Sequence, residues 1–131
     1  MPNDIAQFAG AKYLNLETFR RTGAGVRTPV WFARDGSHNA PTITLFYIYS
    51  EADAGKVKRI RNNPKVHIAP CTMRGDLRGA WIDGRARICG DDEAAHGQQL
   101  LTQKYGLPKI LGDFFSRLMR HKQTVIAVEV D

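Results

Sequence analysis

The sequence predicts a mainly β domain of the α+β class, in which six antiparallel strands form a small barrel flanked by short helices. Six short runs are rich in β-branched and aromatic residues, and turn residues such as Gly, Pro, Asn and Asp separate most of them. Few stretches have helical periodicity. With 131 residues the chain can form one sizeable core but not two, so we expect residues 1–131 to fold as a single domain.

The first half of the chain predicts one helix followed by three strands. Ile5 and Phe8 fall at helical spacing behind a capping Asn3 or Asp4, which predicts a helix over residues 5–14. From residue 16 onward the periodicity becomes that of strands. The predicted strands cover residues 16–20, 27–34 and 43–50. An Asp-Gly-Ser-His-Asn turn lies between the last two, which therefore predict a hairpin.

The second half predicts three helices and three more strands. A short basic helix follows the strand that ends at Ser50. The helix over residues 91–105 begins with three acidic residues, which suit the positive end of the helix dipole. The last run, residues 124–130, is β-branched and predicts a strand with at least one buried face. The remaining predicted elements are strands over residues 65–72 and 79–89 and a helix over residues 109–121.

Charge and cysteine content limit the classes of function. Lys and Arg outnumber Asp and Glu by 19 to 13, and the net charge of +6 favours nucleic acid, an anionic membrane surface or a phosphorylated cofactor as partner. No window approaches the roughly 18 apolar residues of a membrane span, and no charged leader precedes an apolar core. Cys71 and Cys89 lack the spacing of a disulfide framework or a zinc site. Charge alone cannot choose among these partners. From the missing span, the missing leader and the cysteine spacing we expect a cytoplasmic protein with no membrane partner and no metal site.

The most informative stretch covers residues 50–66, where a strand-like run ends in a turn and a short basic helix begins. Lys56, Lys58, Arg59 and Arg61 concentrate positive charge within about two helical turns. The backbone N–H groups at the start of a helix also attract phosphate. The combination predicts an anion site, although a basic run alone is more often a solvated helix face.

Residues in and around this turn resemble a known superfamily. The turn is similar to the strand-turn-helix signature of the pyridoxamine 5'-phosphate oxidase-like, flavin-binding split β-barrel proteins. The flanking segments resemble the branch of deazaflavin-dependent oxidoreductases, whose coenzyme is F420, and the resemblance extends from about Tyr13 to Val130. The matching turn residues are Ser50, Lys56, Ile60, Asn63, Pro64 and Val66. The matching flanking residues are 28–32, 69–71 and 81–86 together with Gly75 and Gly79.

The resemblance implies a split β-barrel homodimer that binds its cofactor in a groove between subunits and transfers hydride between F420 and a small organic substrate. It places the cofactor phosphate at Lys56, beside Ser50, and the ring against residues 30–32. The chemistry belongs to the cofactor, so no catalytic side chain is expected. The cofactor-binding residues that we expect are Val30, Trp31, Phe32, Tyr49, Ser50, Lys56, Lys58, Pro70, Cys71 and Trp81.

Two other cofactors remain open within the same superfamily. Relatives that use flavin mononucleotide (FMN) carry an arginine and a lysine on the strand that corresponds to residues 29–32, which are apolar here. This difference makes FMN the less favoured cofactor. A related branch binds haem, but neither His67 nor any other histidine has the sequence context of an axial ligand.

A nucleic-acid-binding small barrel is the alternative from another class of protein. It would combine the net positive charge with Phe46, Tyr47 and Tyr49 as a platform on which bases stack. This hypothesis requires several of these rings to be exposed on one strand face. The alternation of Tyr47 and Tyr49 with apolar residues favours a barrel core instead.

Several of these residues also have a purely structural interpretation. Arg74, Arg78, Arg85 and Arg87 form a second basic set, which either contacts an anionic ligand or forms a solvated face. Tryptophan in a strand more often belongs to a core or a dimer interface than to a cofactor platform. Cys71 has no histidine or acid near it in sequence to activate a thiol, so we expect a small packed residue.

Overall fold

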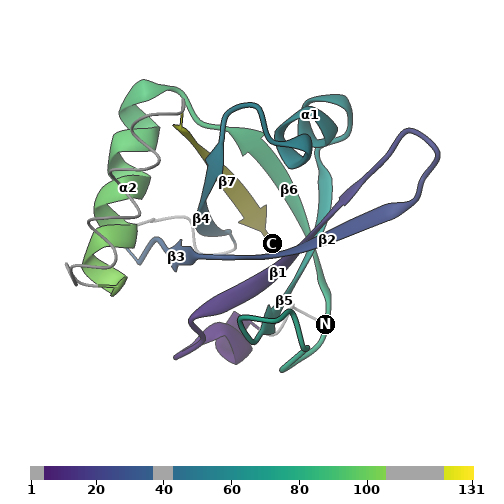
Figure 1. Ribbon diagram of the computed structural model, residues 1–131. Coiled ribbons are helices and arrows are strands. Elements are labelled where there is room, and N and C mark those ends of the chain that lie inside the picture. Colours follow the sequence, from purple (N-terminus) through teal and green to yellow (C-terminus); the bar gives the residue numbers. More distant parts are fainter. Residues whose placement is uncertain (1–4, 37–42, 106–122) are drawn as a thin grey trace.

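In the part of the chain that the structure describes, one antiparallel sheet curls around the core and carries two helices and a short 3-10 helix (Figure 1). The computed structural model describes residues 5–36, 43–105 and 123–131. None of the helices in these ranges is long and apolar enough to cross a membrane. The elements in chain order are η1 (Ile5–Phe8), β1 (Tyr13–Phe19), β2 (Gly25–Val30), β3 (Phe32–Arg34), β4 (Thr44–Glu51), α1 (Gly55–Asn62), β5 (Lys65–Cys71), β6 (Ile82–Ile88), α2 (Asp91–Tyr105) and β7 (Gln123–Val130).

The strand order β2-β1-β5-β6-β7-β4-β3 makes one chain segment supply both edges of the sheet. The edge strands β2 and β3 are consecutive and separated only by Trp31. On one side of this residue Val30 pairs with Leu14 of β1, and on the other Phe32 pairs with Ile48 of β4. Because the two edges are joined at Trp31, the sheet closes into a barrel that is split at this point.

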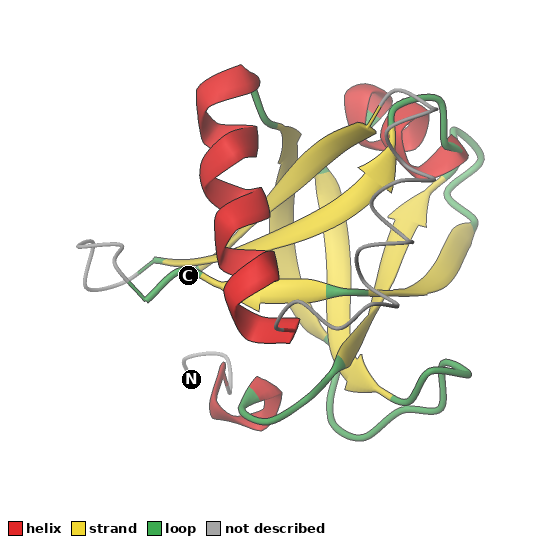
Figure 2. Ribbon diagram, turned by 60° about the vertical axis from the view of Figure 1, so that its left-hand side comes forward, coloured by secondary structure: helices red, strands yellow, loops and turns green. Residues whose placement is uncertain are grey.

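Apolar side chains pack on both faces of the sheet because strand residues alternate between faces. Leu16 of β1 and the pair Phe46 and Ile48 of β4 belong to the main core inside the curl. On the outer face, Tyr47 of β4 packs with Leu101 of α2 in a second cluster. Figure 2 shows α2 lying across this outer face. The predicted class, mainly β with flanking helices, is confirmed.

The N-terminal helix is shorter than the sequence predicts. Its helical part covers only Ile5–Phe8, and Gly10 then adopts a φ of 75°, which lies outside the helical range. Tyr13 and Leu14 already belong to β1. The strand alternation that buries Leu14 and Leu16 in the core outweighs the helical spacing of the residues before them. The prediction of a helix over the whole segment was therefore wrong.

The strand predicted over residues 27–34 is two strands, because the chain leaves one sheet edge and joins the other at Trp31. The sheet consequently has seven named strands in the described part of the chain, where six were predicted. The predicted hairpin is confirmed, because β3 pairs antiparallel with β4. The helix Asp91–Tyr105 is confirmed at both ends. The helix predicted over residues 109–121 lies outside the described residues.

The strand aromatics do not provide a platform for nucleic-acid bases. Phe46, Tyr47 and Tyr49 are 0%, 2% and 7% exposed. Base stacking requires an accessible ring face, and these three rings belong to the two cores. The requirement on which the nucleic-acid hypothesis depends is not met by these residues.

Gly97 allows α2 to pack closely on the sheet. A Cβ atom at this position would lie 2.9 Å from Tyr47 Cδ1 and 2.9 Å from Val125 Cγ1, both in buried side chains. We expect Gly97→Val to lower the free energy of unfolding by about 1–3 kcal/mol through overpacking, as measured by urea denaturation. The control Ala95→Val, at an exposed position of the same helix, should cost less than about 0.7 kcal/mol. Equal losses in both variants would contradict a tight contact at Gly97.

Candidate functional site

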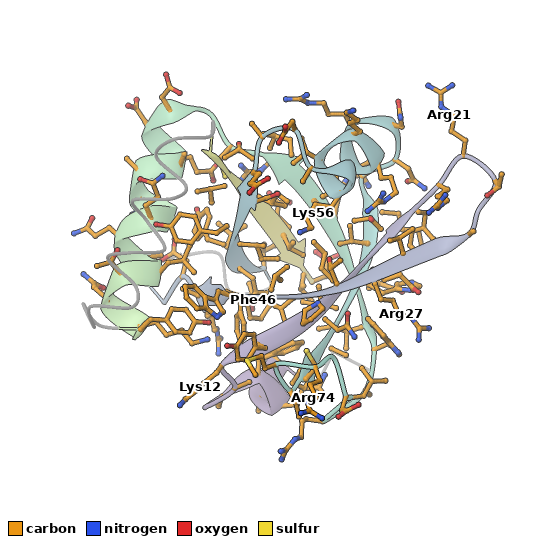
Figure 3. The ribbon with its side chains drawn as sticks, in the orientation of Figure 1. Lys12, Arg21, Arg27, Phe46, Lys56 and Arg74 are labelled. Carbon is orange, nitrogen blue, oxygen red and sulfur yellow. The ribbon has the colours of Figure 1, made fainter. Side chains whose placement is uncertain are left out.

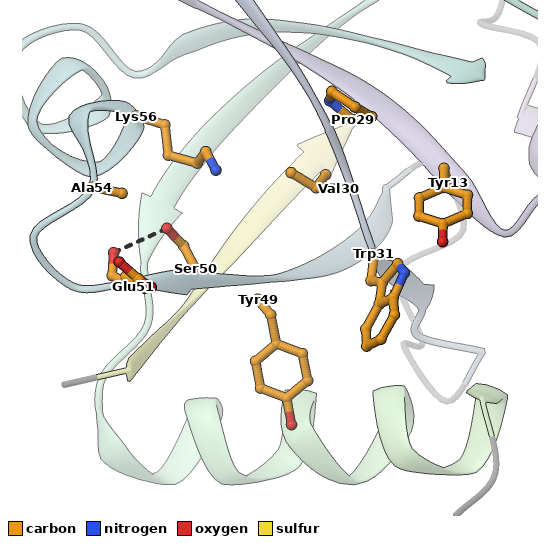
Figure 4. A pocket seen from close by; sticks show the side chains of 9 residues that line it. All are labelled: Tyr13, Pro29, Val30, Trp31, Tyr49, Ser50, Glu51, Ala54 and Lys56. Atoms are coloured by element: carbon orange, nitrogen blue, oxygen red, sulfur yellow. Dashed lines mark hydrogen bonds between the residues drawn. The ribbon is translucent and has the colours of Figure 1, made fainter. Parts of the chain in front are cut away.

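A cavity of about 430 Å³ lies in the split of the barrel, between β2 and β4 (Figure 4). β4 continues beyond Ile48, the last residue that pairs with β3 on that side, and its next residues pair only with β7. Meanwhile β2 diverges toward β1, which leaves room between the two strands. The cavity is lined by Tyr13, Pro29, Val30, Trp31, Tyr49, Ser50, Glu51, Ala54 and Lys56.

Lys56 enters this cavity from the first turn of α1. Val57 and Ile60 are buried in the core, and Ile60, four residues further on, lies on the same side of the helix as Lys56, so Lys56 projects inward (Figures 3 and 4). Burial lowers the pKa of Lys56, the charge of Arg59 lowers it further, and Glu51 has the opposite effect. The ammonium is thus poorly solvated, and an anion in the cavity would stabilise its charged form.

Other groups add positive potential at this end of the cavity. Ala54 occupies the N-cap of α1 and makes no side-chain capping hydrogen bond, so the first backbone N–H groups have no side-chain acceptor at that position. Arg59 Nε donates to Thr18 Oγ1 at 2.7 Å. Burial lowers the pKa of Arg59, and the nearby charge of Arg20 lowers it further. Arg59 and Arg20 therefore add to the positive potential around Lys56.

An aromatic wall forms the other end of the cavity, where Trp31 lies near Tyr13 (Figure 4). The Trp31 ring stacks on Tyr105 of α2, with centroids 5.2 Å apart and an interplanar angle of 25°. Tyr105 Oη accepts a hydrogen bond from the Phe32 backbone N–H at 3.1 Å. It lies 2.7 Å from the Lys12 carbonyl oxygen and 3.0 Å from that of Phe32, to one of which it donates. The last turn of α2 thus fixes the orientation of the wall.

β4 contributes three consecutive residues to the cavity floor. Ser50 Oγ donates to the Glu51 carbonyl oxygen at 3.0 Å, drawn as the dashed line in Figure 4. The hydroxyl of Tyr49 points toward α2, so its ring borders the cavity while its polar end does not (Figure 4). Burial raises the pKa of Tyr49 to about 12, with a hydrogen bond to Thr102 acting in the opposite direction. Tyr49 is therefore uncharged at neutral pH.

Half of the predicted cofactor-binding residues meet in this cavity: Val30, Trp31, Tyr49, Ser50 and Lys56. The other five do not line it. Phe32 is 2% exposed and belongs to the core. Lys58 is exposed, because two residues along a helix rotate a side chain by about 200° away from Lys56. Pro70 and Cys71 are buried within β5, and burial raises the pKa of the Cys71 thiol, which makes it a weak nucleophile.

Trp81, the fifth, belongs to a separate polar cluster. The Arg27 guanidinium lies 4.8 Å from the centroid of its ring. Arg27 Nε in turn donates to Glu17 Oε2 at 2.8 Å. Both ring nitrogens of His67 are engaged, with Nδ1 2.9 Å from Glu17 Oε1 and Nε2 2.9 Å from Asp83 Oδ1. The charged groups of this cluster pair with one another, and none of its residues lines the cavity.

Four residues of the cavity were not predicted from the sequence: Tyr13, Pro29, Glu51 and Ala54. Tyr13 was assigned to the N-terminal helix, so its place beside Trp31 could not be inferred. Glu51 directly follows Ser50, and this adjacency was the one available signal. Proline and alanine carry no chemical signature that would reveal a cavity wall.

One arginine of the second basic set, Arg87, has a structural role. Arg87 makes two contacts with Glu93 of α2, of which the Nη2 to Oε2 contact measures 2.8 Å, and its Nε lies 3.5 Å from Glu129 Oε1. Tyr47 Oη donates to Glu93 Oε2 at 3.1 Å. Neither Arg87 nor the other three arginines line the cavity. In the described part of the chain no three His, Cys, Asp or Glu side chains group as metal ligands do.

Comparisons with known proteins establish the fold. No family model matches the chain, and no curated protein matches it in sequence. An F420 reductase has a similar structure, with a TM-score of 0.60 and 19% identity over 100% of this chain and 96% of the other. The haem storage protein HutZ from Vibrio cholerae has a TM-score of 0.65 and 14% identity over 96% and 86% of the two chains. A candidate pyridoxamine 5'-phosphate oxidase from Listeria innocua has a TM-score of 0.58 and 14% identity over 97% and 88%. The chain has the split-barrel fold of pyridoxamine 5'-phosphate oxidase-like proteins, as its sequence predicts.

The hydroxyl of Tyr105 is expected to stabilise the split. We expect Tyr105→Phe, which keeps the ring but removes the hydrogen bonds to Phe32 and Lys12, to lower the free energy of unfolding by about 1–3 kcal/mol in urea denaturation. The control is Tyr13→Phe, since the Tyr13 hydroxyl makes no hydrogen bond within the described residues. Its effect should stay within about 0.5 kcal/mol. A Tyr105→Phe variant as stable as this control would show that the hydroxyl does not hold the split.

Proposed function

We propose that the protein is an oxidoreductase that uses the deazaflavin coenzyme F420 to transfer hydride to or from a small organic substrate. One observation carries the proposal: a single cavity joins an aromatic wall at Trp31 to a partly buried ammonium at Lys56. A flat ring system with an anionic tail complements both ends. The resemblance of the basic turn and the shared fold of an F420 reductase support the same cofactor.

The residues of the cavity fit such a cofactor. Its volume of about 430 Å³ lies within the range of about 300–1,000 Å³ that is usual for small-molecule sites. When bound, F420 supplies the hydride chemistry. Lys56 and the N–H groups at the start of α1 hold the phosphate, while Trp31 and Val30 position the ring and exclude water. Because the chemistry belongs to the cofactor, the proposal requires no catalytic side chain.

Charge favours F420 over FMN. The phosphate of FMN is a terminal dianion, and Lys56 is the only cation among the described residues that line the cavity. The internal phosphodiester of F420 carries a single charge, which one lysine can match. The acidic tail of F420 can then extend over Arg59 and Arg20, whose charges are not paired with a described carboxylate.

Haem is less favoured as the cofactor, because the described histidines that could bind its iron are already engaged. His67 is engaged by Glu17 and Asp83, and His96 Nε2 lies 3.0 Å from Asp35 Oδ2.

We further propose a cytoplasmic homodimer in which a second copy completes the cofactor groove. Met73 and Leu77, on the loop between β5 and β6, are large apolar residues that are 67% and 46% exposed. A second copy could cover them, because exposed apolar residues of this kind are common at interfaces. Light scattering on the purified protein gives its mass in solution. A monomer at all concentrations would contradict the homodimer but leave the cofactor proposal standing.

The central experiment is a titration of the protein with F420, FMN and haem, followed by fluorescence and absorbance. We expect F420 to bind, and Lys56→Gln to raise its Kd about 10- to 100-fold, because a charge-assisted hydrogen bond contributes about 1.5–3 kcal/mol. Lys58→Gln is the matched control, since it removes the same charge from the same helix outside the cavity. It should change Kd by no more than about twofold.

Each result separates two hypotheses. Failure of all three cofactors to bind would contradict the proposed oxidoreductase. Equal losses in Lys56→Gln and Lys58→Gln would point to diffuse attraction by net charge instead of a phosphate site. The deazaflavin lacking its phosphate and tail should bind equally to the wild type and to Lys56→Gln, since the missing groups are those that Lys56 contacts.

The affinity for F420 should also depend on pH through Lys56. The ammonium form binds the phosphate, so affinity falls as rising pH deprotonates it, and the lowered pKa moves this fall below the range of an ordinary lysine. The phosphodiester does not titrate between about pH 6 and pH 10 and cannot cause the change. Measuring Kd across this range should show the fall in the wild type and not in Lys56→Gln. The same fall in both proteins would assign it to another group.

A further inference from the structure

A second cavity lies between η1, β3 and the last turns of α2, and it shares no lining residue with the first. Its volume is about 400 Å³. The large apolar side chains of its lining are those of Ile5, Phe8, Phe32 and Leu100. Phe8 packs edge-on against Phe32, with ring centroids 5.9 Å apart. The cavity therefore has an aromatic floor suited to a small apolar or aromatic group.

Lys104 places an ammonium group over this floor. Its Nζ lies 3.3 Å from the centroid of the Phe32 ring and donates to the Phe32 carbonyl oxygen at 2.8 Å. Although the side chain as a whole is exposed, burial of its charged end lowers the pKa of Lys104 to about 8. No carboxylate occurs among the described residues that line the cavity. Within the described residues the ammonium is held near an apolar surface without an anionic partner, and this arrangement costs free energy.

Arg34 supplies a second cation at the same cavity. It belongs to β3, which is an edge strand, and its side chain is exposed. Within the described part of the chain Arg34 forms no ion pair, whereas Arg27 and Arg87 each contact a glutamate. A guanidinium can bind both oxygens of a carboxylate. Two cations at the rim of an apolar cavity form the complement of a molecule with an anionic head and an apolar body.

We propose that this second cavity is a binding site for a small carboxylate with an aromatic or apolar body. The carboxylate lies between Lys104 and Arg34, and the body packs against the half-buried side chains of Ile5 and Leu100, above the buried rings of Phe8 and Phe32. The site is separate from the proposed cofactor cavity and does not depend on which cofactor, if any, the protein binds. Because Lys104 and Tyr105 are adjacent in α2, and Tyr105 stacks on Trp31, the two cavities adjoin the same helical turn.

The test uses 4-fluorobenzoate as the probe and neutral 4-fluorobenzamide as its matched comparison, both titrated into the full chain and followed by ¹⁹F NMR. We expect the carboxylate to bind about tenfold more tightly than the amide. Lys104→Met removes the ammonium and keeps an apolar stem, and it should weaken carboxylate binding about tenfold or more. Arg34→Gln, at an exposed position where folding is not at risk, should weaken it about threefold or more.

Lys56→Gln is the control for the first cavity and should leave 4-fluorobenzoate binding unchanged. The proposal would be overturned if the benzamide bound as tightly as the benzoate, or if the benzoate did not bind. It would also fail if Arg34→Gln had no effect, or if Lys56→Gln abolished binding, because the probe would then occupy the first cavity. None of these outcomes bears on the F420 titration, so the two proposals succeed or fail separately.

Discussion

The geometry of the site depends on one constraint, which is that a single chain segment supplies both edges of the sheet. β2 pairs with β1 and β3 pairs with β4, so Trp31 belongs to neither ladder, and Phe32 is the first residue of its own. Buried backbone groups need partners. Tyr105 and Lys104 provide them by binding the N–H and carbonyl groups of Phe32. The first cavity occupies the split that results. Tyr105, which accepts a hydrogen bond from the Phe32 backbone, also stacks on Trp31 in the aromatic wall.

Most of the fold could be predicted because strand and helix periods are recorded locally in the sequence. The acidic first turn defined the start of α2, and β-branched and aromatic residues defined β4 and β7. The errors arose where tertiary structure decides between local alternatives. The helical spacing of Ile5 and Phe8 suggested a helix through residue 14, yet Leu14 belongs to a strand, in which it pairs with Val30. The break at Trp31 could not be predicted, since it follows from closure of the barrel and not from the residue itself.

The candidate site was predictable only where chemistry is concentrated in sequence. Lys56 and Ser50 belong to the recognisable turn, whereas Pro29 and Ala54 line the cavity through their place in the fold. Sequence also could not distinguish the cations from one another. Arg87 is neutralised by Glu93, while Lys56 lies in a cavity with its pKa lowered by burial. This difference in pairing separates a residue that stabilises the fold from one available to an anionic ligand.

The contacts at the two ends of α2 also restrict how the protein can vary. Glu93 in the first turn is held by Arg87 and Tyr47, and Tyr105 in the last is held by the backbone of Phe32. These anchors are twelve residues apart, or about 18 Å along the axis. One inserted residue between them would rotate one anchor by about 100° relative to the other. The length of α2 between its two anchors is therefore fixed, and we expect insertions and deletions in related sequences to occur outside this helix.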